Sequence, residues 1–426
     1  MGIASKALSA GLVMLGAVGC GALAHASGAD PRLLEAARAE QPAVIATLGE
    51  LVTVESGSTD HEGLGKLATY LEGRLGSLDA KVERVASSTG GPDIVKGVFE
   101  GPGALKIMLI AHTDTVYDKG ILETEPFRQE GNFLYGPGIA DDKGGVAVIL
   151  HSLALLKQAG WNDFARITVL FNPDEEIGSR GSGEMIARLG EEHDVVLSFE
   201  PSAAKAVAQD EGVLLNAAGI STVTIKVEGR AAHAGAAPEQ GRNALIELAH
   251  QLLQTRDAAA EVKGAQLNWT TASAGTVRNQ IPESAEAEGD LRITQPDAND
   301  RLLAALQAKV EESRLVPDTT TTVTVIPGRP IYMAGDKGRA LADLAKSIYA
   351  ELDGRNLLMH PTTNGGTDAG YAGRSGHPAV LEGLGLAGWG YHAKNEYIEI
   401  DSISPRLYLA SRMLIELGKK ANMQSP

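Results

Sequence analysis

Cysteine is almost absent from this chain of 426 residues, in which Cys20 is the only one. A single cysteine cannot form an intramolecular disulfide, and it excludes the cysteine-rich zinc modules. Any metal site in this protein must therefore use nitrogen and oxygen ligands from His, Asp and Glu.

Positive charge is also scarce, because 38 Lys and Arg stand against 54 Asp and Glu and give a formal net charge of −16. This sign disfavours binding to a nucleic acid or to an anionic membrane surface. Aromatic residues make up only 4%, but 43% hydrophobic and 22% charged residues fall in the globular range. The length indicates two or three domains at about 150 residues each.

Beyond the N-terminus, no segment has the roughly 18 consecutive apolar residues that a membrane span needs. At the N-terminus, Lys6 precedes an apolar run from Ala7 to Leu23 and then the small residues of Ala24-His25-Ala26. This layout predicts a signal peptide of residues 1–26 and a periplasmic or secreted mature protein. The alternative is a lipoprotein signal that ends at Cys20, but the three residues before it lack the usual Leu.

Residues 30–215 and 330–426 have patterns typical of an α/β domain. Pro31 and Pro42 are each expected to open an amphipathic helix. Strand-length apolar runs occur at 105–111, 167–171 and 195–199, with a helical pattern at 145–158. Continuous apolar strands that alternate with helices are typical of a mainly parallel, helix-covered sheet. A helix at 339–352, a strand at 379–382 and a helix at 405–417 continue this pattern.

Residues 216–329 follow a different order. Alternating strands are expected at 220–227, 267–277, 285–293 and 319–325, with helices at 243–256 and 297–312. This β-α-β-β-α-β order is ferredoxin-like. The predicted fold class is therefore α/β: a discontinuous domain with a mainly parallel, helix-covered sheet, interrupted by an inserted ferredoxin-like α+β domain.

Potential metal ligands gather where the predicted strands end. They are His112, Asp114, Asp141, Asp142, Glu175, Glu176 and Glu200. Each one alone has an ordinary explanation, such as a capped strand or an acidic first helical turn, and His392 is a loop histidine of a kind that is usually exposed. Together they fall at the edge where open α/β sheets bind ligands. So many carboxylates in one cleft would repel one another without cations, so we predict a site for two divalent ions.

Seven motifs, in this order along the chain, resemble those of the co-catalytic zinc exopeptidases, the family that includes aminoacylases and dipeptidases. They are HTDTV at 112–116, YGPGIADDKGG at 135–145, DEE at 174–176, FEP at 199–201, AHAG at 232–235, GGTD at 365–368 and YH at 391–392. The resemblance extends over residues 40–417 and is greatest to the bacterial glutamate carboxypeptidases (carboxypeptidase G-like).

The resemblance implies two zinc ions per chain, bridged by Asp141. His112 and Glu200 would complete one zinc site, and Glu176 and His392 the other. It also implies that Glu175 is the general base and that Asp114 orients His112.

For the substrate and the assembly, the resemblance implies a homodimer formed by the inserted domain, with His233 reaching a catalytic cleft to stabilise an oxyanion. The expected carboxylate-binding residues are Asn279, Arg292 and Arg329, with the backbone of Gly365 and Gly366 as helpers. The residues alone leave alternatives open. Arg292 would also fit a surface pair with Asp290 or Glu288, and Arg329 a loop cation beside Pro330.

The expected reaction is hydrolysis of the C-terminal amide bond of an N-acyl-L-glutamate or folate-type conjugate. One departure concerns residues 202–219, where a substrate-binding lysine of the family has no clear counterpart and Lys205 stands at a different spacing. This departure keeps open an amidohydrolase or dipeptidase for other N-acyl amino acids. A third alternative is a zinc-binding protein without turnover, which the intact Glu175 disfavours.

Overall fold

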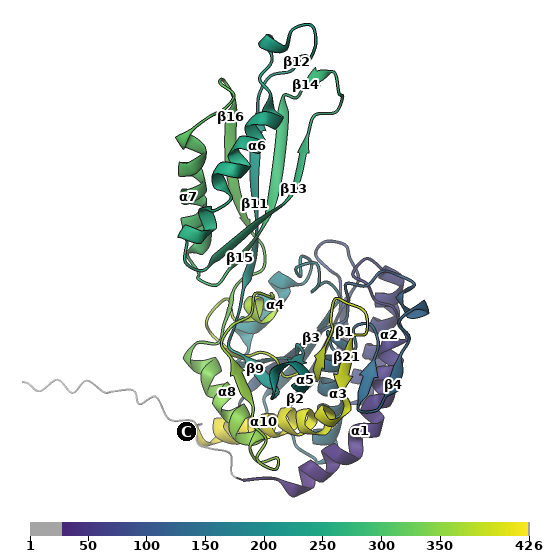
Figure 1. Ribbon diagram of the computed structural model, residues 1–426. Coiled ribbons are helices and arrows are strands. Elements are labelled where there is room, and N and C mark those ends of the chain that lie inside the picture. Colours follow the sequence, from purple (N-terminus) through teal and green to yellow (C-terminus); the bar gives the residue numbers. More distant parts are fainter. Residues whose placement is uncertain (1–27, 425–426) are drawn as a thin grey trace, which may run out of the picture.

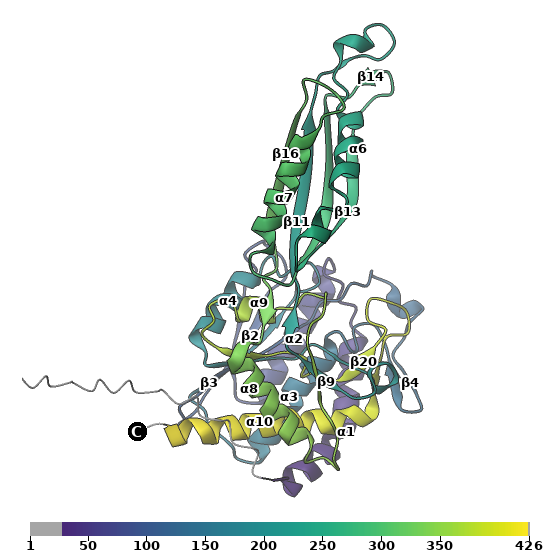
Figure 2. The ribbon, with the colours of Figure 1, turned by 60° about the vertical axis from the view of Figure 1, so that its left-hand side comes forward.

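The computed structural model describes residues 28–424 as two domains, each with its own hydrophobic core (Figure 1). The predicted signal peptide, with Cys20, lies outside the described residues. The larger domain contains the first and last described helices, and the smaller domain projects from it as an elongated lobe (Figure 2). Among the described residues, every helix is too short or too polar to cross a membrane.

A six-stranded sheet in the order β1-β2-β6-β3-β7-β19 forms the centre of the larger domain. Its strands are β1 (Lys81–Val85), β2 (Ile94–Glu100), β3 (Lys106–His112), β6 (Arg166–Asn172), β7 (Val195–Ser198) and β19 (Ala379–Leu381). The strands β6, β3, β7 and β19 are parallel, whereas β2 is antiparallel to both of its neighbours. The carboxyl ends of β3, β6 and β7 therefore meet at one edge of the sheet.

Helices cover this sheet, six of them with ten residues or more and one, α9, with four. They are α1 (Pro31–Val52), α2 (His61–Ser77), α3 (Lys143–Gln158), α4 (Gly183–Glu192), α8 (Gly335–Tyr349), α9 (Ala369–Ala372) and α10 (Ile403–Gln424). The helices α1, α3 and α10 pack against one another, and α8 packs on β19. Between Gly144 and Leu156, α3 has no Asp, Glu, Lys or Arg, as expected for a helix that is buried on nearly all sides.

The prediction that Pro42 opens a second helix is wrong. Helix α1 continues from Pro31 through Pro42 to Val52. A proline inside a helix removes one backbone hydrogen bond. The following residues Val44 and Leu48 are completely buried, and tertiary packing of this kind outweighs local helix preference.

A second, five-stranded sheet was not predicted. Its order is β4-β5-β21-β20-β8, and its strands are β4 (Arg128–Glu130), β5 (Phe133–Tyr135), β21 (Tyr397–Glu399), β20 (Ala387–Trp389) and β8 (Ser202–Ala203). Strands of two or three residues are too short to show an alternating pattern. This sheet joins the loop before α3 to the loop between β20 and β21.

Short elements complete the larger domain. The strand pairs are β9 (Gly212–Leu214) with β18 (Leu358–His360) and β10 (Asn216–Ala217) with β17 (Tyr332–Met333). The helical turns are α5 (Lys205–Ala208), η1 (Ile121–Glu123) and η4 (Ile400–Ser402). The segment at 202–219 is thus folded as short strands and one helical turn.

The inserted domain is an antiparallel sheet in the order β13-β15-β11-β16, covered by two helices that pack together. Its elements are β11 (Gly219–Glu228), α6 (Ala244–Thr255), η3 (Ala258–Glu261), β13 (Ala265–Ala274), β15 (Ser284–Ile293), α7 (Ala298–Glu312) and β16 (Thr320–Pro327). This is the predicted β-α-β-β-α-β order. Near η2 (Pro238–Gln240), the strands β12 (Ala232–His233) and β14 (Gln280–Ile281) pair at the end of the lobe furthest from the larger domain (Figures 1 and 2).

A fully buried ion pair connects α10 to the segment at 202–219. The Nε of Arg406 donates to Oε2 of Glu211 at 2.8 Å, and neither side chain is exposed. Arg406 also donates to the carbonyl oxygens of Gly383 and Gly212 at 3.1 Å. The hydroxyl of Tyr349 donates to the same carboxylate.

We expect Arg406→Ala to lower the free energy of unfolding by about 3–5 kcal/mol, because the buried Glu211 loses its fully buried cation and keeps the partly exposed Arg355, 3.1 Å from its Oε1. Urea denaturation followed by circular dichroism measures this loss. Arg38→Ala is the control, since Arg38 is 61% exposed and lies 3.9 Å from Asp353, and it should cost less than about 0.5 kcal/mol. Equal losses for the two variants would contradict the prediction.

Candidate active site

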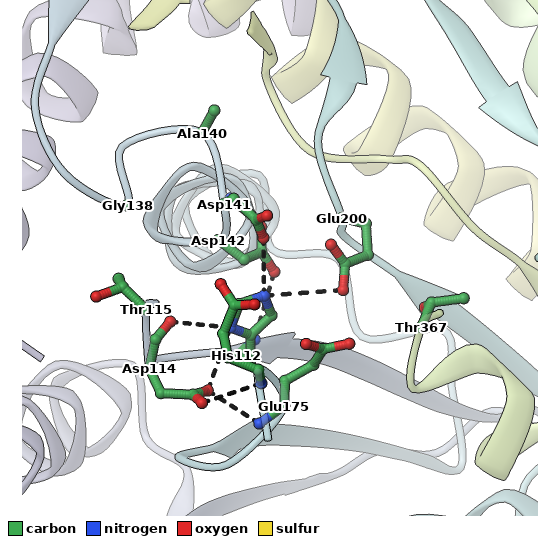
Figure 3. A network of polar contacts seen from close by, with 12 residues as sticks. His112, Asp114, Thr115, Gly138, Ala140, Asp141, Asp142, Glu175, Glu200 and Thr367 are labelled. Carbon is green, nitrogen blue, oxygen red and sulfur yellow. Dashed lines mark hydrogen bonds and ion pairs between the residues drawn. The ribbon is translucent and has the colours of Figure 1, made fainter. Parts of the chain in front are cut away.

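The structure brings the predicted ligands together at the carboxyl edge of the parallel strands. Figure 3 shows His112, Asp141 and Glu200 with Glu175 beside them. The strands supply His112 at the end of β3, Glu175 and Glu176 after β6, and Glu200 after β7. The loops supply Asp141 before α3 and His392 between β20 and β21. Parallel strand order thus converts residues far apart in sequence into one cluster.

Two groups of three potential ligands share Asp141. The first consists of His112, Asp141 and Glu200, the second of Asp141, Glu176 and His392, and the ligand atoms in each group lie within 4.8 Å of one another. The Nε2 of His112 is 3.0 Å from Oδ1 of Asp141, and the Nε2 of His392 is 3.4 Å from Oδ2 of Asp141. Asp141 therefore presents one oxygen to each group.

This donor set fits divalent cations. Each group offers one imidazole nitrogen and two carboxylates, which are ligands that zinc accepts. The Oε1 of Glu176 is buried and has no hydrogen-bond partner among the described residues. A cation bound to the second group would compensate the charge of this carboxylate.

The protonation of the cluster reflects crowded carboxylates. Burial raises the pKa of Glu200, and the neighbouring Asp141 raises it further. Burial also favours a raised pKa for Asp141, but hydrogen bonds with His112 and His392 outweigh it and lower the pKa. Hydrogen bonds with Asp141 and Glu176 raise the pKa of His392 to about 10. Without metal, protons on the imidazoles thus offset the negative charge.

Asp114 connects the potential ligand His112 to the turn at 175–176. It is completely buried, and its Oδ1 lies 3.3 Å from Nδ1 of His112. It accepts hydrogen bonds at 3.0 Å from the backbone N–H groups of Glu175 and Glu176, and one at 2.7 Å from the hydroxyl of Ser58. Asp114 therefore fixes both the ring of His112 and the position of the turn.

Glu175 belongs to neither ligand group. Burial raises the pKa of Glu175 to about 8, although the charges of Arg329 and His112 oppose this shift. The guanidinium of Arg329 donates to both the carboxylate and the carbonyl oxygen of Glu175. A carboxyl group that titrates near neutral pH can both take up and release a proton.

Sequence reasoning missed Glu396, a buried carboxylate that holds the loop of Asp141. It accepts hydrogen bonds at 2.7, 2.8 and 3.0 Å from the backbone N–H groups of Gly138, Ala140 and Asp141. The hydroxyl of Tyr117 donates to it at 2.8 Å. Because Glu396 follows His392 by four positions, it joins the loops of two ligands. In the sequence, its closeness to His392 is the one signal that could have marked it.

A cleft of about 1790 Å³, lined by residues of both domains, contains this cluster. Four of the predicted substrate-binding residues line it, namely Arg292, Arg329, Gly365 and Gly366. Arg292 donates to the carboxylate of Asp290 at 2.7 and 3.0 Å and to the carbonyl of Asn364 at 3.2 Å. The pairing with Asp290, which the sequence left open, is therefore present at the cleft wall.

Two predicted residues lie away from the cleft of their own chain. His233 is in β12 and Asn279 directly precedes β14, at the far end of the inserted domain (Figure 1). The backbone N–H groups of Gly235 and Ala236 donate to Nδ1 of His233 at 3.1 and 3.0 Å. These bonds place the ring proton of the neutral imidazole on Nε2, which remains available as a donor.

Lys205 also lies away from the cleft. Its Nζ is 3.4 Å from Oδ2 of Asp401 and 3.9 Å from Oε1 of Glu211. The described residues that line the cleft include no lysine. The lysine expected from the resemblance therefore has no counterpart in the cleft.

The fold and the donor set define a metal-dependent hydrolase with an α/β catalytic domain. Residues 108–416 match peptidase family M20/M25/M40, and the chain belongs to this family of zinc-dependent exopeptidases. It is 46% identical over 392 residues to carboxypeptidase G2 of Pseudomonas sp. (strain RS-16). The aligned region covers 91% of this chain and 92% of that relative. The match supports a carboxypeptidase G-like enzyme.

Two further comparisons concern a different activity and the fold. The chain is 29% identical over 372 residues to succinyl-diaminopimelate desuccinylase of Methylorubrum extorquens (strain PA1), covering 82% of this chain and 93% of that one. The crystal structure of the M20 family metallo-carboxypeptidase Sso-CP2 from Sulfolobus solfataricus matches with a TM-score of 0.68 at 17% identity, covering 88% and 99% of the two chains. This last likeness shows the shared fold.

We expect Glu396→Gln to weaken zinc binding by about 10–100-fold, because an amide places an N–H group against the loop's own N–H donors. Competition with a chromophoric chelator measures the affinity. The control is Glu399→Gln, three residues later, because Glu399 accepts backbone N–H groups of Lys205 and Ala206 rather than of the ligand loop. An equal loss in both variants, or none in Glu396→Gln, would argue against this role.

Proposed function

We propose that the protein is a di-zinc carboxypeptidase that hydrolyses the C-terminal amide bond of N-acyl-L-glutamate or folate-type conjugates and releases the amino acid. One observation carries the proposal: two ligand groups share Asp141 beside a carboxylate, Glu175, that belongs to neither. The 46% identity to carboxypeptidase G2 supports the same class of reaction.

In this proposal His112, Asp141 and Glu200 hold one zinc ion, and Asp141, Glu176 and His392 hold the other. When bound, the cations supply a water of lowered pKa and polarise the scissile carbonyl group. Glu175 takes the proton of the attacking water and returns it to the leaving amine. The hydrogen bonds of Asp114 keep Glu175 and His112 in place during this exchange.

Binding of the substrate's C-terminal carboxylate would limit the cut to the last amide bond. We assign this task to Arg292 and Arg329, with the N–H groups of Gly365 and Gly366 as helpers, because all four residues line the cleft with Glu175. A net charge of −16 disfavours an anionic substrate unless local cations hold it. Arg329, which already donates to Glu175, would also link substrate binding to the base.

A homodimer is part of the proposal. His233 lies at the far end of the inserted domain, so it could act only in the cleft of a second copy (Figure 2). There its Nε2–H group would donate to the oxyanion that forms during attack. Asn279 would accompany it, because its carbonyl oxygen accepts the N–H group of Ala234 at 2.9 Å. Export through the predicted signal peptide of residues 1–26 stays a prediction.

A second candidate is an amidohydrolase for other N-acyl amino acids. One observation that favours it is that the described residues lining the cleft include no lysine. The relative named succinyl-diaminopimelate desuccinylase, whose name indicates removal of an acyl group from an amino acid, also fits this candidate. A zinc-binding protein without turnover is disfavoured, because such a protein has no use for Glu175 beside its ligands.

A substrate panel compared by kcat/KM separates these candidates. We expect pteroyl-glutamate and N-acyl-glutamates to exceed N-acyl-aromatic amino acids and dipeptides by at least about tenfold. The reverse order would favour the second candidate.

We expect Glu175→Gln to lose about 10²–10⁴-fold in kcat, because the amide cannot accept the proton of water. Wild type and variant should both contain two equivalents of zinc by elemental analysis, so that the loss is assigned to the base. Chelation should abolish wild-type activity, and added zinc should restore it. Turnover of the variant within tenfold of wild type would rule out Glu175 as the base. Glu184→Gln is the control, because it removes an exposed carboxylate at the cleft rim, and its kcat should stay close to that of wild type.

A further inference from the structure

His360 lies over a glycine in the wall of the cleft. In the parallel pair β9–β18, Leu358 pairs with Gly212 and His360 with Leu214, so that side chains at 212 and 360 share one face. A Cβ added to Gly212 would lie 2.4 Å from Cδ2 and 2.5 Å from Nε2 of His360. The imidazole thus occupies the space of a side chain at position 212.

Space, and not backbone conformation, requires the glycine at position 212. Gly212 is not among the glycines with a positive φ, so its backbone would accept another residue. The ring of His360 and, at 3.0 Å, the carbonyl oxygen of Leu358 leave no room for a Cβ at position 212. The two residues therefore form a matched pair.

The ring of His360 lacks a hydrogen-bond partner. Its Nε2 is buried and unpartnered among the described residues. Buried polar groups are nearly always paired, and each exception calls for an explanation. Because His360 and Gly212 both line the cleft that holds the metal-ligand cluster, a bound substrate is a direct source of a partner.

The position of His360 relates it to the amino acid that the reaction would release. The loop that follows β18 contacts both cleft arginines: the carbonyl of Asn364 accepts from Arg292 at 3.2 Å, and a Cβ on Gly366 would lie 2.9 Å from Cδ of Arg329. His360 therefore lies next to the part of the cleft wall that contacts Arg292 and Arg329, the two arginines assigned to the substrate's C-terminal carboxylate.

The arginines of this wall are already paired within the chain. Arg292 donates to Asp290, and Arg329 donates to Glu175. Lys205, in the neighbouring segment, lies by Asp401 and Glu211. Within residues 28–424, the Nε2 of His360 has no such partner, and an imidazole nitrogen can donate or accept a hydrogen bond.

We propose that His360 is a specificity-determining residue that hydrogen-bonds the side-chain carboxylate of the released amino acid, in a place that Gly212 keeps open. The proposal rests on the proposed function and identifies the residue that recognises the glutamate side chain.

The test compares His360→Ala with wild type on two substrates that share one acyl group, N-acyl-glutamate and N-acyl-norvaline, whose side chain ends in a methyl group in place of the carboxylate. For the glutamate substrate, KM should rise about tenfold with kcat within twofold, as expected for one lost hydrogen bond to a charged group. For the norvaline substrate, kcat/KM should stay within twofold. His360→Gln, which keeps an N–H donor, should recover part of the selectivity. Equal losses on both substrates, or no loss on either, would overturn the proposal.

A double-mutant cycle tests the pairing with Gly212. Gly212→Ala alone should lower kcat/KM for N-acyl-glutamate, because its Cβ displaces the ring, and should add nothing to His360→Ala. Additive effects of the two substitutions would contradict the shared space. His377→Ala is the matched control, because His377 is exposed and lies outside the cleft, and it should leave the selectivity unchanged.

Failure of the proposed function is a separate outcome. In that case, the wild-type enzyme would have a higher kcat/KM for another N-acyl amino acid than for N-acyl-glutamate. The same comparison of His360→Ala with wild type is then made on that substrate and its apolar isostere. A selectivity that does not depend on His360 overturns the inference whichever substrate is preferred.

Discussion

The carboxylate of Asp141 lies between two histidines, and the rest of the site depends on this arrangement. One oxygen faces His112 and the other faces His392, which come from opposite ends of the chain. Three further carboxylates lie close by, so the cluster is stable only where positive charge compensates it. Compensation by cations explains why these acids can share one cleft in a protein with a net charge of −16.

Two buried carboxylates that belong to neither ligand group hold this arrangement in place. Asp114 accepts N–H groups from the turn at 175–176, and Glu396 accepts N–H groups from the loop of Asp141. Both therefore convert backbone donors into fixed positions for the ligands, which is how supporting residues tune a metal site. The ligand positions are thus set by the catalytic domain itself, independently of the inserted domain.

The sequence allowed prediction of features that depend on local pattern. The apolar strands that carry His112, Glu175 and Glu200 were predicted because each is a continuous hydrophobic run, and the inserted domain because its helices and strands have clear periods. Features that depend on distant contacts could not be predicted. The unbroken helix at Pro42 depends on tertiary packing, and Glu396 acts on backbone 255 to 258 positions away. The overlap of His360 with Gly212 likewise arises only when β18 pairs with β9.

The cleft divides chemistry from substrate selection between different parts of the structure. Glu175 and three of the potential ligands, His112, Glu176 and Glu200, follow strands of the central sheet, which are buried and closely packed, so changes there affect the metal-ligand cluster and Glu175 together. Arg292 belongs to the inserted domain, and it contacts the segment of the cleft wall that begins at His360 and continues to Gly366. Substitutions in this wall can alter which amino acid fits without moving a metal ligand. Selectivity can therefore change in this wall while the metal-ligand set stays the same, and the pair of Gly212 and His360 is the part of the wall where we propose that the released amino acid is recognised.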